Sequence, residues 1–357
     1  MRIGIDARKI ADSGIGRYTE NLIEKLLEID RLNEYVLFFQ PEDSPNYDYP
    51  GGNVRKVIER AGKYSLAEHW ALARQAEKLE LDIFHATHYV LPRFLKCRSV
   101  VTIHDVIHLI DPSFGFIARA YARAMIRSAI SRSEIVITVS NQTRDDLLSM
   151  FSAPPSKINV IYNGGGSDFL PIARDRLDRT LAGMGLEQGY YLFVGSDRPH
   201  KNLKAVEGSL GAMRADTRFV VVGRVKQSEK KRYEKFGARV KFFEKVDKQK
   251  MEALYCGTAA LLFPSYHEGF GLPPLEAMAC GAPVVASNRS AIPEVTGSAA
   301  ILIDPDDIEA MARALGKIRD DMDERRRLIE AGVKRVAEFS WEKTARATLE
   351  LYERAMR

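Results

Sequence analysis

Short apolar runs alternate with amphipathic stretches along almost the whole chain. Runs rich in β-branched and aromatic residues predict buried strands, and stretches whose apolar residues recur three or four positions apart predict helices. A regular alternation of this kind is typical of βα units built around a parallel sheet.

The predicted elements fall into two series. In the first, strands are predicted at 3–7, 35–39, 54–58, 82–86, 100–104, 135–139 and 158–162, with helices at 17–29, 65–79, 116–132 and 142–150. In the second, strands are predicted at 190–195, 218–223, 240–243, 259–264, 283–287 and 300–303, and a helical tail follows at 341–356. The polar stretch 170–188, which contains Pro171, Gly183 and Gly185, separates them.

The length of 357 residues suits two α/β domains rather than one core. Hydrophobic residues make up 45% and charged residues 28%, as in soluble globular proteins. No apolar run approaches the ~20 residues that span a bilayer, and residues 1–6 resemble a strand rather than a signal peptide. We therefore expect a cytoplasmic protein.

The net charge of +5 is unevenly distributed. Residues 1–170 hold 21 Lys/Arg and 21 Asp/Glu, whereas the remainder holds 32 and 27. The densest stretch, 224–250, has 11 basic and 4 acidic residues. Such a field suits an anionic small molecule or surface, although a solvated helical face has the same composition. Nucleic acid is not expected as a partner, because no aromatic residues are interleaved with the basic ones.

Ligands of open α/β sheets bind beyond the carboxyl ends of the strands, so the loops there are the candidate sites. The first such loop contains Gly14 and Gly16, just ahead of a helix expected to begin near Arg17. Glycines would let a ligand approach the backbone, and the helix N-terminus would attract an anion. A plain turn into a helix has the same pattern.

The second loop follows the strand 100–104 and begins with His104 and Asp105. His104 could donate a proton or a hydrogen bond to a substrate oxygen, or it could cap the local backbone. His85, His88 and His108 lie in the same segment and are interpreted as structural.

The third loop, 195–202, includes Gly195, Ser196, Arg198 and Lys201. Its two cations could neutralise a diphosphate at the following helix N-terminus, and a basic surface turn is the alternative. It lacks the spacing of a P-loop.

The fourth loop, 264–276, is the most informative. Gly269 and Gly271 would expose backbone amides, and a proline near the helix start at 274 suits that position. Glu268 and Glu276 could grip hydroxyls at two points of an elongated polyol ligand. Because Glu276 lies in an apolar run, it would otherwise be an unexplained half-buried charge.

These segments resemble the retaining glycosyltransferases of family four, which have the GT-B fold. The segment Glu268 to Glu276 is similar to their E-x7-E signature. The resemblance spans nearly the whole chain and includes the following further segments: 14–18, 104–105, 139–140, 163–164, 199–202, 281–284 and 339–341.

The resemblance implies an α/β fold of two Rossmann-like, doubly wound domains facing a cleft. Residues 1–170 would form the acceptor-side domain and 187–338 the sugar-nucleotide domain, with the helix 341–357 packed back on the first. The implied site residues are the following: catalytic His104, Glu268 and Lys201; donor-binding Gly14, Gly16, Ser196, Arg198, Lys201, Glu268, Gly269, Phe270, Gly271, Leu272 and Glu276.

Their implied roles differ. Glu268 and the amides of Gly269, Phe270 and Gly271 would contact the donor sugar, and Glu276 would hold the ribose. Lys201 would bind the diphosphate. The sequence departs from the family pattern at Ser196 and His200, where an arginine is common, and Arg198 could supply that charge from a shifted position.

The implied reaction moves a hexose from a nucleoside diphosphate sugar to a hydroxyl of a glycan or lipid-linked acceptor, with retained anomeric configuration. GDP-mannose is the favoured donor and a UDP-hexose the next. No cofactor or metal is expected, because Asp304-Pro305-Asp306 is better explained as a turn than as a metal-binding D-x-D motif.

Two alternatives remain open: a sugar-nucleotide epimerase of the same architecture, and a non-catalytic nucleotide-sugar-binding partner of another transferase.

The helix predicted at 116–132 has a basic face whose partner is a separate question. Arg119, Arg123 and Arg127 recur every fourth residue along one of its faces. They are consistent with a solvated face, or with contact to an anionic membrane or a lipid-diphosphate acceptor at the inner face of a membrane.

Overall fold

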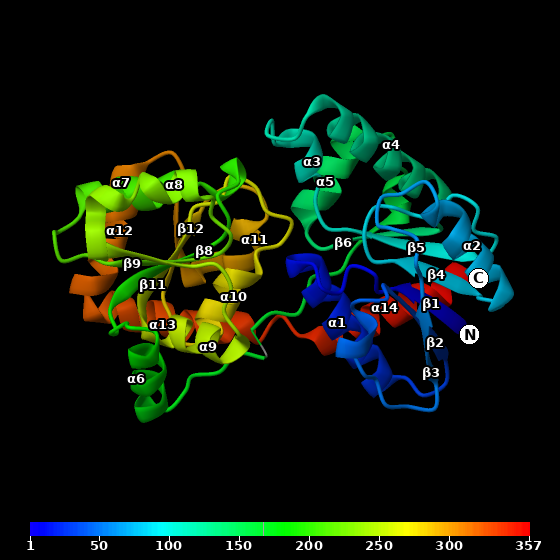
Figure 1. The fold of residues 1–357 in the computed structure, drawn as a ribbon, viewed down its shortest axis with the longest axis horizontal. Helices are drawn as coiled ribbons and strands as arrows, with labels where there is room; N and C mark the ends of the chain where they lie inside the picture. Colours follow the sequence, from blue (N-terminus) through cyan, green and yellow to red (C-terminus); the bar gives the residue numbers. More distant parts are fainter. Residues whose placement is uncertain (167) are drawn as a thin grey trace. The chain divides into compact units, whose positions relative to one another are not determined.

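The computed structural model describes residues 1–166 and 168–357. The chain divides into two compact units. Unit 1 comprises Met1–Gly164 together with Trp341–Arg357, and unit 2 comprises Gly165–Ser340. Each unit contains one parallel β-sheet with helices on both faces (Figure 1).

Unit 1 contains a seven-stranded sheet in the order β3-β2-β1-β4-β5-β6-β7. Its elements in chain order are β1 (Arg2–Asp6), α1 (Ser13–Ile29), β2 (Glu34–Phe39), β3 (Val54–Ile58), α2 (Glu68–Lys78), β4 (Ile83–Ala86), β5 (Arg98–Ile103), α3 (Ile107–Ile110), α4 (Phe116–Arg132), β6 (Ile135–Thr138), α5 (Asn141–Met150), β7 (Ile158–Val160) and α14 (Trp341–Met356). The direction of strand progression reverses between β1 and β4.

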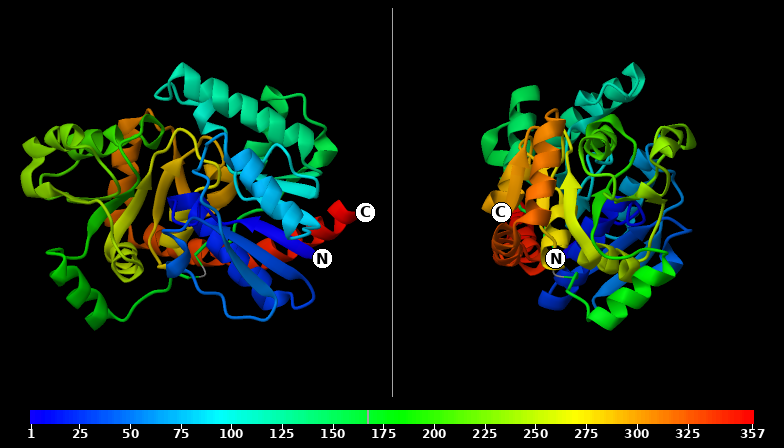
Figure 2. Two further views of the ribbon diagram at one scale, coloured as in Figure 1. Left: turned by 45° about the vertical axis from the view of Figure 1, so that its right-hand side comes forward. Right: turned by 90° about the vertical axis from the view of Figure 1, so that its left-hand side faces the viewer.

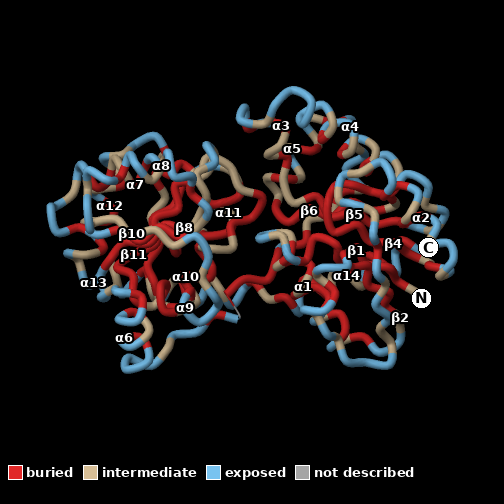
Figure 3. The backbone as a smooth tube through the Cα atoms, viewed as in Figure 1, coloured by how far each residue is buried: buried red, intermediate tan, exposed pale blue. Residues whose placement is uncertain are grey.

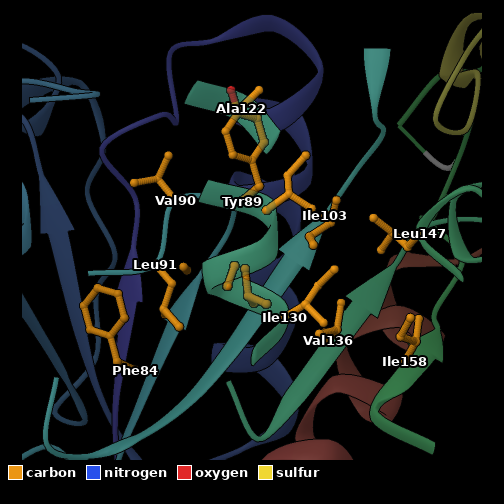
Figure 4. Close-up of a cluster of buried hydrophobic side chains, with 14 of the residues drawn as sticks. Phe84, Tyr89, Val90, Leu91, Ile103, Ala122, Ile130, Val136, Leu147 and Ile158 are labelled. Atoms are coloured by element: carbon orange, nitrogen blue, oxygen red, sulfur yellow. The ribbon is translucent and has the colours of Figure 1, made fainter. Parts of the chain in front are cut away.

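Apolar side chains of α2, α4 and α5 pack on one face of this sheet. Leu72, Ile126 and Leu147 come from these helices and are fully buried with Phe84 and Val136 of the strands. Figure 4 shows part of this cluster, including Phe84, Ile130, Val136 and Leu147. On the other face, α1 lies against α14, which ends at the C-terminus (Figure 2). The hydrophobic periodicity of the helices thus gives unit 1 its layers.

Unit 2 contains a six-stranded sheet in the order β10-β9-β8-β11-β12-β13. Its elements are α6 (Arg174–Gly183), β8 (Tyr190–Val194), α7 (Lys204–Ala212), β9 (Phe219–Val222), α8 (Gln227–Lys231), β10 (Val240–Phe243), α9 (Lys248–Gly257), β11 (Thr258–Phe263), α10 (Leu272–Ala279), β12 (Val284–Ser287), α11 (Ile292–Thr296), β13 (Ala300–Ile303), α12 (Ile308–Asp320) and α13 (Met322–Val336). This is the strand order of a doubly wound nucleotide-binding fold.

The interior of unit 2 is formed by the central strands and the inward faces of the helices. Val206 of α7 and Leu315 of α12 are fully buried with Val221 and Leu262 of the sheet. Figure 3 shows the central strands of both units buried and the outward sides of the helices exposed. The α/β, doubly wound fold class expected from the sequence is confirmed in both units.

The division between the units falls between Gly164 and Gly165, before the boundary expected at residue 170. Gly165 and Phe169 already pack within unit 2. A Cβ on Gly165 would lie only 2.4 Å from Leu275 Cδ1, and the Phe169 ring contacts Tyr255 at 5.6 Å between centroids. Burial of this segment, rather than its polar composition, sets the division.

The first turn of α1 differs from the expectation. The helix was expected near Arg17 but begins at Ser13, so Gly14 and Gly16 lie inside its first turn and not in a loop ahead of it. The amide of Gly16 donates to Asp12 O at 2.6 Å. A Cβ at Gly16 would lie 2.1 Å from Ile10 O. Close packing against the backbone therefore requires glycine at this position.

Every helix in the described part of the chain lacks the combination of length and apolar character needed to cross a membrane.

Candidate active site

The carboxyl ends of β8 and β11 meet in the middle of the sheet of unit 2. The two strands are neighbours, and the strand order proceeds in opposite directions from them. In an open parallel sheet, such a reversal leaves a crevice in which ligands bind. The loops that follow these strands are those predicted for the diphosphate and the donor sugar, so the fold brings the two together.

Lys201 and Glu268 form an ion pair at this point. Lys201 ends the 3-10 helix Pro199–Lys201 after β8, and its Nζ donates to Glu268 Oε1 at 2.6 Å. The side chains are 22% and 13% exposed, so the pair is shielded from bulk water but remains accessible. A ligand with both anionic and hydroxyl groups could engage the two ends of the pair separately.

Backbone contacts hold the two loops together. The amide of Tyr266 donates to His200 O at 2.8 Å. Asn202, directly after Lys201, has a left-handed conformation with φ of 54°. Its buried side-chain amide donates to Pro305 O at 2.7 Å, which stabilises this turn. The backbone at Lys201 is therefore held in place by contacts that do not involve the Lys201 side chain.

Ser290 anchors the backbone of Glu268. Its Oγ donates to Glu268 O at 2.9 Å and accepts from Glu268 N at 3.2 Å. Both contacts are made through the main chain of Glu268, so its carboxylate is left to interact with Lys201. Ser290 was not singled out from the sequence, because a serine after a distant strand carries no local signal of this contact.

The rest of the glycine loop leads directly into α10. Phe270 is buried, and its ring packs edge-on against Phe339 at 5.6 Å between centroids. Gly271, the N-cap, has φ of 99°, a conformation that glycine adopts far more readily than other residues. The helix begins at Leu272, two residues before the expected start at Pro274. Gly269 lies between Phe270 and the ion-paired Glu268.

Glu276 differs from the expectation of a half-buried charge. It is only 3% exposed, and the buried Tyr255 hydroxyl donates to its Oε2 at 2.8 Å. Burial of this carboxylate is thus compensated within the protein, at least in part, by a phenol from α9. The inference that a ligand must explain its burial is therefore wrong, and assignment of a ribose contact to Glu276 stays a prediction.

Ser196 and Arg198 lie in the same loop as Lys201. The Arg198 amide donates to Ser196 Oγ at 3.5 Å, and the Arg198 side chain is exposed. The loop is also tied to the segment between β9 and α8, because the Lys226 amide donates to Asp197 Oδ2 at 2.9 Å. Arg198 thus lies beside the site, with its guanidinium more accessible than the Lys201 ammonium.

Asp304 and Asp306 share an arginine. Arg289 Nη2 lies 2.8 Å from Asp304 Oδ1 and 2.8 Å from Asp306 Oδ2. The Asp306 amide donates to Asp304 Oδ1 at 2.9 Å, as in a turn closed by an aspartate side chain. These carboxylates therefore already have a cationic partner.

In unit 1, His104 follows β5 and packs within the protein. Its Nε2 lies 2.9 Å from Thr87 O, and its ring contacts Tyr18 edge-on at 4.8 Å between centroids. Burial lowers the pKa of His104, although the Thr87 carbonyl and Asp105 oppose this effect. A neutral His104 that donates through Nε2 keeps a lone pair on Nδ1, so it can accept a hydrogen bond from a hydroxyl. From the sequence alone, His104 is expected either to donate to a substrate oxygen or to cap the local backbone, and neither expectation includes this acceptor role.

The carboxyl ends of β1 and β4 form a second point of strand reversal, in unit 1. Lys9 follows β1, is 3% exposed, and contacts the hydroxyl of Tyr64 and Asp12 Oδ2. His88 follows β4 and is 2% exposed, and within the described residues neither of its ring nitrogens has a hydrogen-bond partner. Sequence reasoning missed Lys9 and interpreted His88 as structural. The position of both directly after strands was the available signal.

Arg8 fixes the loop that carries Lys9. It donates to both carboxylate oxygens of Asp6, at 2.8 and 2.7 Å, and to Glu68 Oε2 at 2.9 Å. Burial acts to raise the pKa of Asp6, but the nearby guanidinium outweighs it and holds that pKa below its ordinary value. Burial raises the pKa of Glu68 against the effect of the same guanidinium. This buried network rigidifies the strand-reversal point of unit 1.

Two family models match the chain, one in each unit. Residues 13–164 match the model described as Glycosyltransferase Family 4. Residues 182–335 match the model described as Glycosyl transferases group 1.

Among curated proteins, the O-antigen chain mannosyltransferase B of Escherichia coli is 26% identical over 371 residues, covering 96% of each chain. Among solved structures, a sucrose-phosphate synthase from Thermosynechococcus elongatus has a TM-score of 0.79 at 22% identity, covering 99% of this chain and 98% of its own. Anabaena HepE, solved in complex with UDP and glucose, has a TM-score of 0.80 at 15% identity, with 99% of both chains covered. At these identities the structural neighbours establish the GT-B fold.

Proposed function

Because this chain belongs to the family 4 glycosyltransferases, whose two domains it carries in order, we propose that it is a retaining hexosyltransferase. It moves a hexose from a nucleoside diphosphate sugar to a hydroxyl of a glycan or lipid-linked acceptor, and the anomeric configuration of the hexose is retained. The observation that carries this proposal is the Lys201–Glu268 pair, at 2.6 Å, where the strand order of unit 2 reverses. A cation and a carboxylate held side by side match the diphosphate and the hydroxyls of such a donor.

In the proposed reaction the bond between the anomeric carbon and the diphosphate breaks, and a bond to the acceptor oxygen forms. The acceptor proton goes to a phosphate oxygen of the leaving group. Lys201 and Arg198 stabilise the charge that develops on the diphosphate, and donors of this kind each contribute about 10²–10³ in rate. In unit 1, Nδ1 of His104 accepts from a sugar hydroxyl. Product NMR tests the stereochemistry, since an inverted anomeric configuration contradicts retention.

Mannose is the proposed hexose and GDP-mannose the proposed donor. The support is the Escherichia coli relative named as an O-antigen chain mannosyltransferase, which is covered almost from end to end. A UDP-hexose is the second candidate, because the HepE structure contains UDP and glucose.

The donor assignment predicts that GDP, or UDP if the second candidate holds, raises the melting temperature of unit 2. A ligand that binds only the folded state at a hundredfold excess over Kd stabilises it by about 2.7 kcal/mol. Lys201→Ala should weaken nucleotide binding by about 10- to 150-fold, because a hydrogen bond to a charged group contributes roughly 1.5–3 kcal/mol. Thermal-shift titrations with both nucleotides provide the measurement.

Lys204→Ala is the matched control, since Lys204 is exposed at the start of α7, three residues after Lys201. It should bind nucleotide like the unchanged protein. If neither nucleotide shifts the melt at millimolar concentration, the donor assignment is wrong. If both lysine variants behave alike, the diphosphate binds elsewhere.

We also propose catalysis without a divalent ion, because cationic side chains can take the part that the ion plays for the diphosphate. Asp304 and Asp306 are already bridged by Arg289. Transfer activity should therefore persist in excess EDTA. Complete loss of turnover, restored by Mg²⁺ or Mn²⁺, would assign a metal to these carboxylates instead.

A further inference from the structure

Two of the three cysteines of the chain lie together in unit 2. Cys256 belongs to the last turn of α9, and Cys280 is the C-cap of α10. The two helices pack against each other (Figure 1). The Sγ atoms of the two cysteines lie 3.8 and 3.9 Å from the same atom, the carbonyl oxygen of Leu170. The fold thus brings together two free thiols that no local spacing in the sequence pairs.

The two thiols differ in exposure and in acidity. Cys256 is partly exposed, whereas Cys280 is only 5% exposed. The hydrogen bond that Cys280 donates lowers the pKa of Cys256 to about 7, an effect that burial opposes and the Ile172 backbone supports. The same hydrogen bond, followed by burial, raises the pKa of Cys280. At neutral pH Cys256 therefore has strong thiolate character, and Cys280 keeps its proton.

An accessible thiolate beside a second thiol is the arrangement of a redox-sensitive cysteine and its resolving partner. We propose that Cys256 and Cys280 form a modification site at which a peroxide oxidises the two thiols to a reversible disulfide. Cys256 is the thiol that the peroxide reaches, because it is the more exposed of the two. Cys280 resolves the oxidised sulfur from within the protein.

The proposed oxidation proceeds in two steps. The Cys256 thiolate attacks one oxygen of hydrogen peroxide, the O–O bond breaks, and Cys256 sulfenic acid and hydroxide are formed. The Cys280 sulfur then attacks the Cys256 sulfur, so that the S–S bond forms and the S–O bond breaks. The hydroxide ions take up the thiol protons and leave as two water molecules. Two electrons pass from the thiols to the peroxide, and a dithiol reductant returns them.

The modification site lies next to the hydrogen bond between Tyr255 and Glu276. Tyr255 directly precedes Cys256, and the amide of Cys280 donates to Glu276 O at 3.1 Å, one turn earlier in α10. A disulfide holds its sulfurs about 2 Å apart, closer than non-bonded sulfurs can approach, so its formation alters the packing between these helix ends. Oxidation should therefore weaken the donor binding that we assign to Glu276. This consequence rests on the proposed function, whereas the oxidation does not.

Peptide mapping of the full chain tests the proposal. No Lys or Arg lies between Lys250 and Arg289, so trypsin leaves both cysteines in one peptide, 251–289. A slight excess of hydrogen peroxide at neutral pH should lower the mass of this peptide by about 2 Da, for the two hydrogen atoms removed. Further cleavage after Glu268 and Glu276 should leave the two cysteine-containing fragments joined until dithiothreitol separates them.

Cys97→Ser is the matched control, because burial raises the pKa of Cys97 to about 11. This variant should form the same disulfide as the unchanged protein. Cys280→Ser should form none and should instead accumulate a sulfenic acid at Cys256, which dimedone traps. In the reduced unchanged protein at neutral pH, iodoacetamide should alkylate Cys256 at least about tenfold faster than Cys97, because the thiolate is the reactive form.

Thermal-shift titration relates the modification site to the donor. The disulfide should weaken binding of GDP or UDP at least about fivefold, and bound nucleotide should disfavour the disulfide by the same factor, because such coupling is reciprocal. Dithiothreitol should restore binding. Cys256→Ser with Cys280→Ser should bind nucleotide equally with and without peroxide. Absence of nucleotide binding in both redox states would contradict the proposed function and not the oxidation.

Four outcomes of the mapping would contradict the modification site itself. The proposal is wrong if peroxide leaves Cys256 and Cys280 reduced, or if Cys97 is oxidised at the same rate. It is also wrong if the unchanged protein stops at a Cys256 sulfenic acid, or if the disulfide that forms joins two chains.

Discussion

The two glutamates of the glycine loop have different surroundings, and this suggests different roles. Glu268 is partly exposed and paired with Lys201, so a ligand can compete for it. Glu276 is buried and accepts from Tyr255, so its position is set by the protein. A group that can change partners is suited to the sugar, where charge develops during transfer, whereas a fixed acceptor is suited to the unchanging ribose.

We predict that Glu268→Gln lowers kcat by about 10²–10³ at saturating donor, because a contact strengthened in the transition state is lost. Nucleoside diphosphate affinity should stay the same or increase, since Lys201 is released from its carboxylate partner. Glu276→Gln should instead raise the donor KM and weaken the nucleotide. Steady-state kinetics and calorimetry on both variants provide the measurements.

Tyr255→Phe separates the structural part of the Glu276 effect, because it removes the phenol that donates to this carboxylate and leaves the carboxylate itself. If Tyr255→Phe weakens nucleotide as much as Glu276→Gln does, Glu276 acts through packing and not through the ribose. If Glu268→Gln loses nucleotide affinity while Glu276→Gln loses only kcat, the donor lies along the loop in the opposite direction.

At the scale of the element, Gly14 and Gly16 of α1 belong to the same sequence motif but differ in how closely their surroundings pack. Both lie in the first turn of the helix. A Cβ on Gly14 would meet nothing within 4 Å, whereas one on Gly16 would lie 2.1 Å from the backbone oxygen of Ile10. A backbone atom cannot move aside as a flexible side chain can, so the start of α1 depends on Gly16.

Gly16→Ala should therefore destabilise unit 1 by about 1–3 kcal/mol or more, the usual cost of overpacking. Gly14→Ala should be neutral or stabilising by up to about 1 kcal/mol, because alanine favours the helix. Urea denaturation of both variants makes the comparison. Equal losses would show that the close approach at Gly16 is relieved by a shift of the helix. A folded Gly14→Ala enzyme with weakened donor binding would instead favour a ligand contact at Gly14.

At the scale of the whole molecule, buried neutral histidines make stability depend on pH. Burial lowers the pKa of His85 to about 3, and its ring nitrogens lie 2.6 Å from the Tyr352 hydroxyl and 2.8 Å from Thr102 Oγ1. Burial also places the pKa of His88 well below its ordinary value. Above pH ~6.5 both states of the chain hold these histidines neutral. Below it, only the unfolded chain takes up the protons.

The free energy of unfolding should consequently fall as the pH drops from about 6.5 to 5, by about 1.4 kcal/mol per pH unit for each such histidine. Glu68 opposes the trend, because its raised pKa lets the folded state bind a proton more readily. The matched test is His85→Gln, whose amide can still bond to Tyr352 and Thr102. Urea denaturation at several pH values gives the slope of the free energy of unfolding against pH. This slope should be smaller for His85→Gln than for the unchanged protein, by about 1.4 kcal/mol per pH unit. An unchanged slope would mean that His85 is protonated in the folded protein.

The sequence by itself was sufficient for the fold class and for the positions of the strands, whereas the starts of α1 and α10 differ from the predicted ones. Strands such as Val54–Ile58 and Val240–Phe243 and helices such as Phe116–Arg132 occur with the predicted bounds. The reason is that hydrophobic periodicity and turn residues act locally, within a few positions of the chain. The resemblance to the family likewise rests on short runs of consecutive residues, the E-x7-E segment among them, and both family models match in the expected order.

Only the tertiary structure decided which polar groups are partnered. Lys201 meets Glu268, and Glu276 meets Tyr255, across separations that no periodicity records. It also brought Lys9 and His88 to one edge of a sheet, which the sequence alone had not singled out. Such contacts depend on which strands are neighbours in the sheet, and long-range packing determines that spatial order. Residue type and local spacing therefore predict what a site contains, whereas the fold determines which of its charges are left to meet a substrate.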